Sequence, residues 1–567
     1  MKKVYALLKK NDIGFAETFL VVSIFVVGLF NDFLCCFSAS VLFIYLCVSV
    51  IKRKKITLYL NLTGISVVII GLFFFLSVLW AVDGGAALVG GFRFLPVVLF
   101  LFIVMIKSKN PENYLEIIPA GAVFMTVLSA IMSFIPFTEN LVEIAGRLCG
   151  FFQYSNTFAL FLLISFIITA TKEQINKYEY VYFPVFIFGI MYAGSRTVFV
   201  LLILSVVGLL VFSKNKKLKF TVFCISAVVF SVIIAVALLT GNFYSIGRFF
   251  TISLKESTFV GRLLYYYDAL PVILRNPLGL GYEGYYYMQG SFQTGVYSVR
   301  FVHNDFLQML LDIGWLPTGV FVAAIIKAFF GKGTSFRRRM LILVICIHSF
   351  FDFGLQYMAM FMLFILLLDV KAPKEINIST KKAVIVPVCV VGTLLSLYLG
   401  VALCFSFRGT GETALGLYPL STKDDIALLV SETDSAKIEK IADRIIERNE
   451  YVSLAYSAKA KVAFSKGDIE KMMEYKEKAI DKTVFSYDEY FDYCSMLIYS
   501  VDLYMKAGDM ESVKECSKKI FALEASLREN SNRLSYFGKM IKDQPITEFP
   551  DDIKEYIDKL RVFSVEQ

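Results

Sequence analysis

Runs of about 20 apolar residues recur through the first 405 residues, and they constrain the fold more than any other feature of this chain. A helix that crosses a bilayer needs about 20 mostly apolar residues, and by that length we count roughly thirteen such segments. Hydrophobic residues make up 57% of the sequence and mean hydropathy is +0.65, which an ordinary soluble protein of this size does not reach. The sequence therefore predicts an all-α, polytopic membrane bundle of about 12 to 13 spans.

The apolar runs also give approximate limits for each span. These limits are 14–31, 33–51, 58–80, 86–106, 117–136, 148–171, 180–195, 197–213, 219–240, 304–330, two spans sharing 340–370, and 383–405. The run at 340–370 is long for one helix and short for two, with a predicted turn near Phe353-Gly354. The N-terminus MKKVYALLKK resembles the start of a signal sequence, but no small-residue cleavage site follows, so an uncleaved first span is predicted.

Basic residues indicate how the spans are oriented, because cytoplasmic loops of membrane proteins carry an excess of Lys and Arg. The lysine-rich loops follow alternate spans, at 52–55, 107–109, 172–177, 214–219, 332–339 and 371–382. This pattern requires an even number of crossings within 340–370. It predicts a multi-pass membrane protein with a cytoplasmic N-terminus, a long extracytoplasmic loop near 241–303, and an extracytoplasmic segment after 405. The net charge of +9 then reflects orientation and not nucleic-acid binding.

The composition changes after residue 405, which divides the chain into a membrane domain (1–405) and a second domain (406–567). The second domain has frequent Lys, Glu and Asp, with apolar residues at helical spacing, and Gly467-Asp468 and Gly508-Asp509 mark two helical hairpins. Their period is longer than the roughly 34 residues of a tetratricopeptide repeat, so we predict a soluble α-helical, tetratricopeptide-like domain. Such a domain binds a partner or packs on its own membrane domain.

A polar, aromatic stretch from Gly261 to Trp315 interrupts the apolar sequence. It is rich in Tyr, Gly, Asn and Arg, and it contains His303, one of two histidines in the chain. A polar segment of this length in so apolar a chain must face water or line a cavity. We interpret this stretch as the active site.

Six arginines fall on the predicted outer side, against the usual bias of basic residues towards the cytoplasm. They are Arg147, Arg196, Arg248, Arg262, Arg275 and Arg300. An anionic ligand explains them, because the planar guanidinium binds phosphate oxygens bidentately. Arg196 follows Gly194-Ser195 at a predicted helix start, where free N–H groups also favour phosphate. For the arginines other than Arg196 and Arg262, contact with lipid headgroups is the alternative.

Eight tyrosines lie between Tyr265 and Tyr297, and they include Tyr266 and Tyr282. Their flat faces and hydroxyl groups suit stacking on sugar rings. The alternative is the belt of tyrosines that membrane proteins place at the bilayer interface.

The remaining candidates are isolated polar residues in apolar surroundings. His348 is predicted to be a packed, hydrogen-bonded histidine with Asp352 as a candidate partner, and Arg93 is a charged residue within a span. The ten cysteines form no CxxC pair or His/Cys cluster and no carboxylate cluster is evident, so neither a metal nor another cofactor is predicted. Cys494 and Cys516 are candidates for a disulfide, although connectivity cannot be read from sequence.

Three segments resemble the O-antigen ligase and polymerase superfamily. They are GSRT at 194–197, GRLLYYYDALPVILRNPLGLGY at 261–282, and HNDFLQMLLDIGWLPTGVF at 303–321. The resemblance implies metal-independent transfer or polymerisation of glycans carried on undecaprenyl diphosphate at the outer face of the plasma membrane. It also places the two key arginines of the family on Arg196 and Arg262, and its key histidine on His303.

The chemistry of these residues agrees with that resemblance. Arg196 and Arg262 are predicted to stabilise the departing diphosphate. His303 is the candidate base for the acceptor hydroxyl, since an imidazole titrates near neutral pH. The candidates for orienting the histidine or binding substrate are Asn304, Asp305, Arg147, Arg300, Tyr266 and Tyr282.

The predicted partners are a polyprenyl-diphosphate-linked glycan donor, a glycan, lipid or protein acceptor, and membrane lipid. The competing class is a transporter or flippase of lipid-linked oligosaccharide, which favours two similar halves around a midplane site. We find no convincing internal repeat, and the polar residues gather at one face. The C-terminal domain is absent from simple ligases, so the acceptor, the sugar and the choice between ligase and polymerase stay open.

Overall fold

The computed structural model describes residues 14–53, 55–106, 110–212, 257–371, 374–379 and 381–565, together with Lys219, Ala227 and Ser231. The chain forms two compact units. Unit 1 comprises Met1–Leu76, Val89–Ser253 and His303–Cys404, and unit 2 comprises Ser77–Leu88, Leu254–Val302 and Phe405–Gln567. The span predicted over 219–240 and Arg248 lie outside the described residues.

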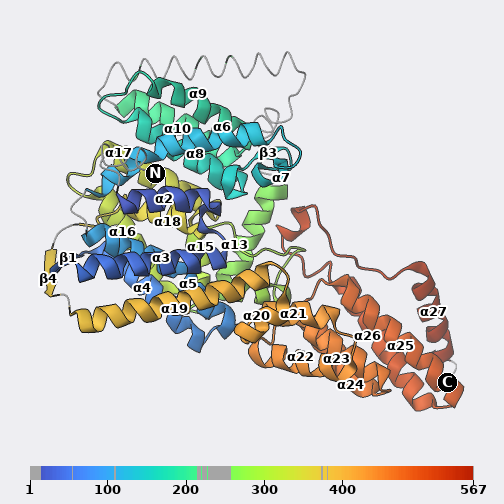
Figure 1. Cartoon of the computed structure of the whole chain (residues 1–567). Helices are drawn as coiled ribbons and strands as arrows, with labels where there is room; N and C mark the ends of the chain where they lie inside the picture. The colour runs from blue at the N-terminus through green and yellow to red at the C-terminus, as the bar shows by residue number, and fades with distance from the viewer. Residues whose placement is uncertain are drawn as a thin grey trace. The chain divides into compact units, whose positions relative to one another are not determined.

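Five long apolar helices establish that the chain is an all-α, polytopic membrane protein, as the sequence predicts. Among the described residues, the helices long and apolar enough to cross a bilayer are Asp32–Ile51 (α3), Leu62–Leu79 (α4 and η2), Gly84–Ile106 (α5), Pro111–Met132 (η3 and α6) and Lys382–Phe407 (α19) (Figure 1). The apolar window of α5 is 78% buried, whereas those of the other four are 22 to 39% buried. Helix α5 is therefore an inner helix, and the others keep apolar faces that suit contact with lipid.

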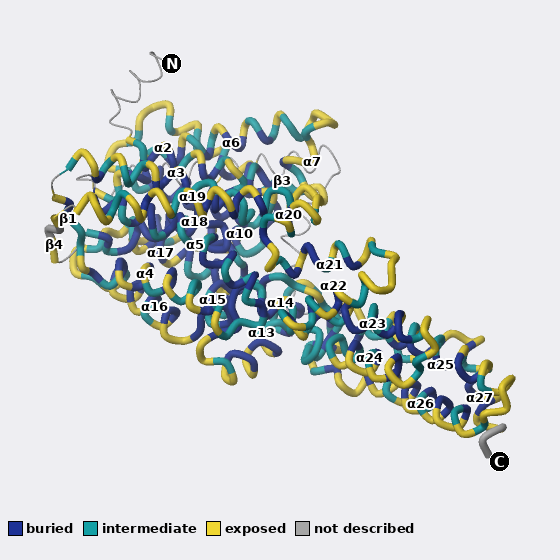
Figure 2. The backbone as a smooth tube through the Cα atoms, turned by 60° about the horizontal axis from the view of Figure 1, so that its bottom comes forward, coloured by how far each residue is buried: buried dark blue, intermediate teal, exposed yellow. Residues whose placement is uncertain are grey.

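Shorter helices complete the core of unit 1. They are α2 (Phe15–Phe25), α8 (Ser155–Ala170), α9 (Tyr182–Ala193), α10 (Arg196–Phe212), α15 (Asp305–Ile313), α16 (Trp315–Phe330), α17 (Phe336–Ser349) and α18 (Met358–Ile365). Helices α8 and α18 are buried along nearly their whole length, as expected of apolar helices surrounded by other helices. Figure 2 shows this buried backbone in dark blue around α18 and α5.

The apolar run at 340–370 forms two helices. Helix α17 ends at Ser349 and α18 begins at Met358, with a 3₁₀ turn (η7, Gly354–Gln356) between them. The break therefore lies at the turn predicted near Phe353-Gly354, and it places Asp352 outside both helices.

Two short strand pairs depart from the predicted all-helical pattern. Strand β1 (Lys55–Leu60) pairs antiparallel with β4 (Lys374–Ser379), and its sequence KITLYL is rich in the β-branched and aromatic residues that favour strands. The predicted span limit at residue 58 is therefore wrong, because helix α4 begins only at Leu62. Strands β2 (Glu143–Ile144) and β3 (Arg147–Leu148) form a second, smaller hairpin.

Unit 2 contains antiparallel helical pairs formed by the C-terminal part of the chain. Its helices there are α20 (Gly411–Leu417), α21 (Thr422–Ser431), α22 (Ser435–Arg448), α23 (Ser453–Ser465), α24 (Ile469–Lys482), α25 (Tyr487–Ala507), α26 (Met510–Glu529) and α27 (Asp551–Val565). Gly467 and Gly508 adopt positive φ angles of 77° and 74° after α23 and α25. Asp468 and Asp509 then cap α24 and α26 through backbone N–H groups. The two Gly-Asp pairs thus mark hairpins, as predicted.

Cys494 and Cys516 are buried free thiols, so the disulfide considered from sequence is not formed. Burial raises the pKa of Cys494 to about 12 and that of Cys516 to about 11. Both side chains pack in the hydrophobic core of the helical pairs and behave as apolar residues.

The polar loop from Leu254 to Val302 belongs to unit 2 because it packs on the C-terminal helices. Val484 donates its backbone N–H to the carbonyl oxygen of Gly290 at 3.0 Å. Leu264 of α13 (Ser257–Arg275) is buried in a cluster with Ile541. Unit 2 is therefore more than the predicted domain at 406–567, since it also includes two segments that the sequence places in the membrane domain.

Unit 2 also includes Ser77–Leu88. The turn at Asn276–Gly281 explains how this segment packs within unit 2. Gly281 has a φ of 79°, and a Cβ there would lie only 2.4 Å from the Cβ of Ala81. Val82 donates its backbone N–H to Leu280 O at 3.0 Å. The glycine thus permits a close approach of two backbone segments.

Gly538 tests whether packing on the C-terminal helices holds the loop in place. A Cβ at this position would lie 2.1 Å from the carbonyl oxygen of Thr294, an overlap that only a backbone shift relieves. We expect Gly538→Ala to destabilise unit 2 by about 1 to 3 kcal/mol and to speed proteolysis between residues 257 and 302 in the purified protein.

Gly416→Ala is the matched control, because nothing lies within 4 Å of a Cβ at that helical position. It should be cleaved at the rate of the wild type. Equal cleavage of the two variants would show that the loop keeps its structure without this contact.

Candidate functional site

A buried carboxylate, Asp352, collects hydrogen bonds from several parts of unit 1. The side chain is 2% exposed, and its Oδ1 lies 2.8 Å from the hydroxyl of Tyr154 and 3.3 Å from Nδ1 of His303. Its Oδ2 accepts a hydrogen bond from Nδ2 of Asn156 at 2.6 Å. A buried carboxylate is tolerated only when donors surround it in this way. We call Asp352, His303, Tyr154 and Asn156 the Asp352 cluster.

His303 is held at the start of α15 in a left-handed backbone conformation. Its φ of 53° is uncommon for a residue other than glycine, and such conformations cluster at functional sites. The following residue, Asn304, caps α15, because its Oδ1 accepts the N–H groups of Phe306 and Leu307 at 3.1 and 3.0 Å. Asn304 Nδ2 also donates to the carbonyl oxygen of Phe350 at 3.2 Å. Asn304 therefore fixes the histidine to the segment that carries Asp352.

The contact with Asp352 also selects the tautomer of His303. An ionised carboxylate can only accept a hydrogen bond, so Nδ1 carries the hydrogen and Nε2 keeps its lone pair. The imidazole packs edge-on against Phe353, with ring centroids 4.9 Å apart, and the side chain is 23% exposed. A partly exposed imidazole with a fixed tautomer suits a base that takes a proton from a bound hydroxyl group.

Arg147 connects the Asp352 cluster to the end of α9. One guanidinium NH₂ group donates to Oδ1 of Asn156 at 2.8 Å, and Nε donates to the carbonyl oxygen of Ala193 at 2.8 Å. Asn156 thus bridges the arginine and Asp352. The guanidinium offsets the charge of the carboxylate through one intervening amide.

Arg196 occupies the predicted position at the start of α10. Gly194 ends α9 with a φ of 60°, Ser195 is buried, and α10 begins at Arg196. Phe199 donates its N–H to the carbonyl oxygen of Ser195 at 2.9 Å, which completes the first helical turn. Arg196 is therefore in the first turn of a helix, where backbone N–H groups favour an anion.

Asp305 and Arg93 stabilise the segment between α17 and α18 from inside the bundle. Asp305 is fully buried and its Oδ2 accepts the N–H of Leu355 at 3.0 Å. Arg93 is 2% exposed, forms an ion pair with Asp32 at 2.5 Å, and donates to the carbonyl oxygen of Gln356 at 2.5 Å. Both residues hold backbone next to Asp352, and we assign them to positioning it.

His348 is fully buried, and Gly354 packs against its ring, so that a Cβ on the glycine would lie 3.2 Å from Nδ1. The sequence suggested Asp352 as its partner, which stays a prediction; the Asp352 carboxylate bonds His303, Tyr154 and Asn156.

Unit 2 carries the other predicted site residues. Arg262 lies on α13 one turn before Tyr265, and burial raises the pKa of Tyr265, an effect that the arginine charge partly offsets. Tyr266 is half-buried on the same helix. Arg300 donates through Nε to Oε1 of Glu283 at 2.6 Å and through an NH₂ group to the hydroxyl of Tyr282 at 2.8 Å. Glu283 therefore balances the charge of Arg300.

Asp268 of α13 holds the later part of the polar loop in unit 2 through its carboxylate. Its carboxylate accepts hydrogen bonds from the N–H and hydroxyl of Thr294 at 2.9 and 2.6 Å, and from the hydroxyl of Tyr297 at 2.9 Å. Burial raises the pKa of Asp268, while these hydrogen bonds act in the opposite direction. Asp268 thus fixes the end of the loop to α13.

The structure therefore divides the predicted residues between the two units. His303, Asn304, Asp305, Arg147 and Arg196 lie in unit 1, and Arg262, Arg300, Tyr266 and Tyr282 lie in unit 2. Sequence reasoning missed Tyr154 and Asn156, whose signal was a polar Tyr-Ser-Asn segment at the head of an apolar run. No three His, Cys, Asp or Glu side chains gather as a metal site in the described part of the chain.

Comparison with known proteins gives one family match. Residues 181–322 match the family model described as O-antigen ligase, which confirms the resemblance to that superfamily. The match includes Arg196, Arg262 and His303, and the C-terminal part of unit 2 lies outside it. No curated protein matches the chain.

The ion pair between the buried Arg93 and the partly exposed Asp32 offers a test of the support beneath Asp352. Arg93→Met removes the ion-pair partner of Asp32, whose side chain is 21% exposed, so the loss should be smaller than the cost of about 3 to 5 kcal/mol for a fully buried pair. We expect this variant to melt below the wild type in detergent. Arg93→Met/Asp32→Leu should recover much of the loss, since an apolar pair replaces the ion pair. If the double variant is as unstable as the single one, the charge pair is not the source of the stabilisation.

Proposed function

Because the chain carries an O-antigen ligase domain, we propose that it transfers or polymerises a glycan from a polyprenyl-diphosphate carrier onto an acceptor hydroxyl. The general activity, ligation or polymerisation of glycans at a membrane, follows from the matched domain. The pairing of His303 with Asp352 is the observation that carries the more specific proposal, because it provides an oriented base. We further infer that the reaction takes place at the outer face of the plasma membrane, as the lysine-rich loops indicate.

In the proposed reaction, Nε2 of His303 accepts the proton of the acceptor hydroxyl. The oxygen attacks the anomeric carbon of the donor, and the bond from that carbon to the diphosphate oxygen breaks. The electron pair of that bond leaves with the diphosphate, whose charge Arg196 and Arg262 stabilise. A diphosphate is a good leaving group, so the mechanism needs no general acid and no metal ion.

The remaining site residues support this reaction at a distance from the proton transfer. Arg147 adds positive charge beside the turn that precedes Arg196, and Asn304 and Asp305 hold the histidine segment. Arg300 is charge-balanced by Glu283, so we propose that it orients Tyr282 instead of binding the diphosphate. Tyr266 and Tyr282 are candidates for contact with sugar.

Analysis of cell-surface glycan in a deletion strain tests the proposed function. Glycan that remains attached but loses chain length indicates a polymerase. Accumulation of a lipid-linked polymer indicates a ligase. Lipid-linked donor that accumulates on the cytoplasmic side supports the transporter alternative, and an unchanged glycan profile would refute the proposal.

Substitutions in the site separate the roles of its residues. His303→Ala should reduce transfer by about 100- to 10,000-fold while the lipid-linked donor still binds. Asp352→Asn should also reduce transfer, by as much as the loss of about 100- to 10,000-fold expected for His303→Ala, since the asparagine no longer selects the tautomer of the base. Arg196→Lys and Arg262→Lys should retain little transfer activity, because lysine cannot bind two phosphate oxygens as the planar guanidinium of arginine does. Donor affinity, turnover and melting temperature are measured on the same purified variants.

Asp369→Asn is the matched control for Asp352→Asn. Asp369 forms an ion pair with Arg338 at 2.8 Å after the end of α18, and its variant should retain transfer. Weaker donor binding in His303→Ala with normal turnover at saturation would make His303 a binding residue and remove the base from the mechanism.

A further inference from the structure

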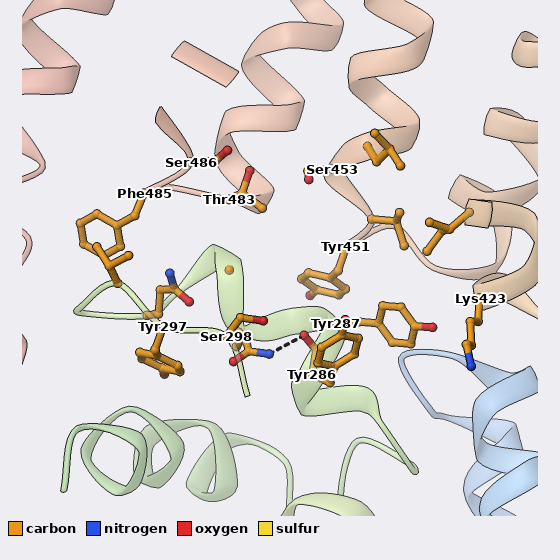
Figure 3. Close-up of a pocket in the computed structure, with 17 residues that line it drawn as sticks. Tyr286, Tyr287, Tyr297, Ser298, Lys423, Tyr451, Ser453, Thr483, Phe485 and Ser486 are labelled. Carbon is orange, nitrogen blue, oxygen red and sulfur yellow. Dashed lines mark hydrogen bonds between the residues drawn. The ribbon is translucent and has the colours of Figure 1, made fainter. Parts of the chain in front are cut away.

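Unit 2 contains a cavity of about 440 Å³ that the proposed mechanism does not use. Residues 286–298 of the loop form one wall, and residues of the C-terminal helices around 451–454 and 483–486 form the opposite wall (Figure 3). This volume is within the range of about 300 to 1,000 Å³ that is typical of ligand pockets. We propose that the cavity binds an oligosaccharide segment of the donor or acceptor glycan, an inference that rests on the proposed function.

Aromatic rings from both walls suit the faces of sugar rings. The aromatic residues that line the cavity are Tyr286, Tyr287, Tyr297, Tyr451 and Phe485. Tyr286 and Tyr287 project from α14 (Gly284–Met288), whereas Tyr451 projects from the C-terminal side (Figure 3). A sugar ring presents an apolar C–H face that packs on such rings, while its hydroxyl groups remain available for hydrogen bonds.

Polar groups between these rings suit sugar hydroxyls. The polar lining consists of Gln289, Gln293, Ser298, Lys423, Ser453, Thr483 and Ser486. Among the described lining residues, Lys423 is the only one with a side chain charged at neutral pH. A lining of neutral donors and acceptors beside aromatic rings favours a glycan over a phosphate-rich or strongly charged ligand.

Hydrogen bonds within the loop hold its wall of the cavity in position. Gln289 donates through Nε2 to the carbonyl oxygens of Tyr286 and Val299 at 2.8 and 3.0 Å, and its Oε1 accepts the N–H of Val299 at 3.0 Å. The first of these bonds is drawn in Figure 3. A preorganised wall lowers the entropic cost of binding. This reduction matters most for a ligand that binds weakly, such as a neutral glycan.

The cavity is connected to the helix that carries Arg262. Tyr297, a lining residue, donates its hydroxyl to Asp268 of α13 at 2.9 Å. Asp268 follows Arg262 on the same helix. A glycan held in the cavity is thus bound by the same packed loop that presents one of the two arginines of the proposed diphosphate site.

Binding to the full-length protein in detergent tests the inference. The probe is a set of fluorescently labelled oligosaccharides from partial hydrolysis of the surface glycan of the wild-type strain. Tyr286→Ala/Tyr451→Ala removes a ring from each wall, and Ser298→Trp fills the cavity from an exposed position. We expect both variants to bind the probe about tenfold more weakly or worse, as removal of an interface aromatic typically does.

Tyr499→Ala is the matched control, because Tyr499 is a 57% exposed tyrosine on α25 and does not line the cavity. It should bind the probe as the wild type does. If both cavity variants also bind like the wild type while His303→Ala abolishes transfer, the cavity inference is overturned and the proposed function stands. If the wild type binds no probe and the deletion strain keeps its surface glycan, the proposed function fails and the cavity inference fails with it.

Discussion

The site in unit 1 depends on keeping the carboxylate of Asp352 buried inside an apolar bundle. Removal of an ion from water costs several kcal/mol even after relaxation, so this carboxylate is stable only because donors converge on it. Those donors come from the start of α8 and from the residue before the α15 cap. Arg147, joined to the carboxylate through Asn156, supplies the compensating positive charge. A single buried carboxylate thereby orients the imidazole of His303, selects its tautomer, and holds Arg147 nearby through Asn156.

The position of that carboxylate depends in turn on the break between α17 and α18. A continuous apolar helix would leave Asp352 within regular structure, whereas the break lets the backbone bend around it. The bend is held by Asp305 through Leu355, by Arg93 through Gln356, and by the stacking of Phe30 on Tyr357 at 4.6 Å. The burial of Asp305 and Arg93 in unit 1 is therefore explained by one requirement, the support of an irregular segment in an apolar environment.

Local features of this protein could be predicted from sequence, and long-range contacts could not. The apolar runs indicated the membrane bundle, Gly194-Ser195-Arg196 indicated a helix start, and the two Gly-Asp pairs indicated hairpins, because each signal lies within a few neighbouring residues. The bond between Asn156 and Asp352 joins residues 196 positions apart, and β1 pairs with a strand more than 300 residues away. No local periodicity encodes such a contact, so His303 was predicted as a base without the partner that orients it.

The loop of unit 2 poses a different physical problem, because a polar segment has little apolar surface with which to offset the entropy of ordering. It is ordered by apolar contacts of Val260 and Leu264 with Ile541 and by backbone hydrogen bonds to the C-terminal helices. The glycines at 290, 295 and 538 permit these segments to meet at backbone distance. Helix α13, and Arg262 with it, therefore owes its packing to residues that lie beyond position 405. The C-terminal helices thus influence the proposed diphosphate site through the order that they impose on this loop.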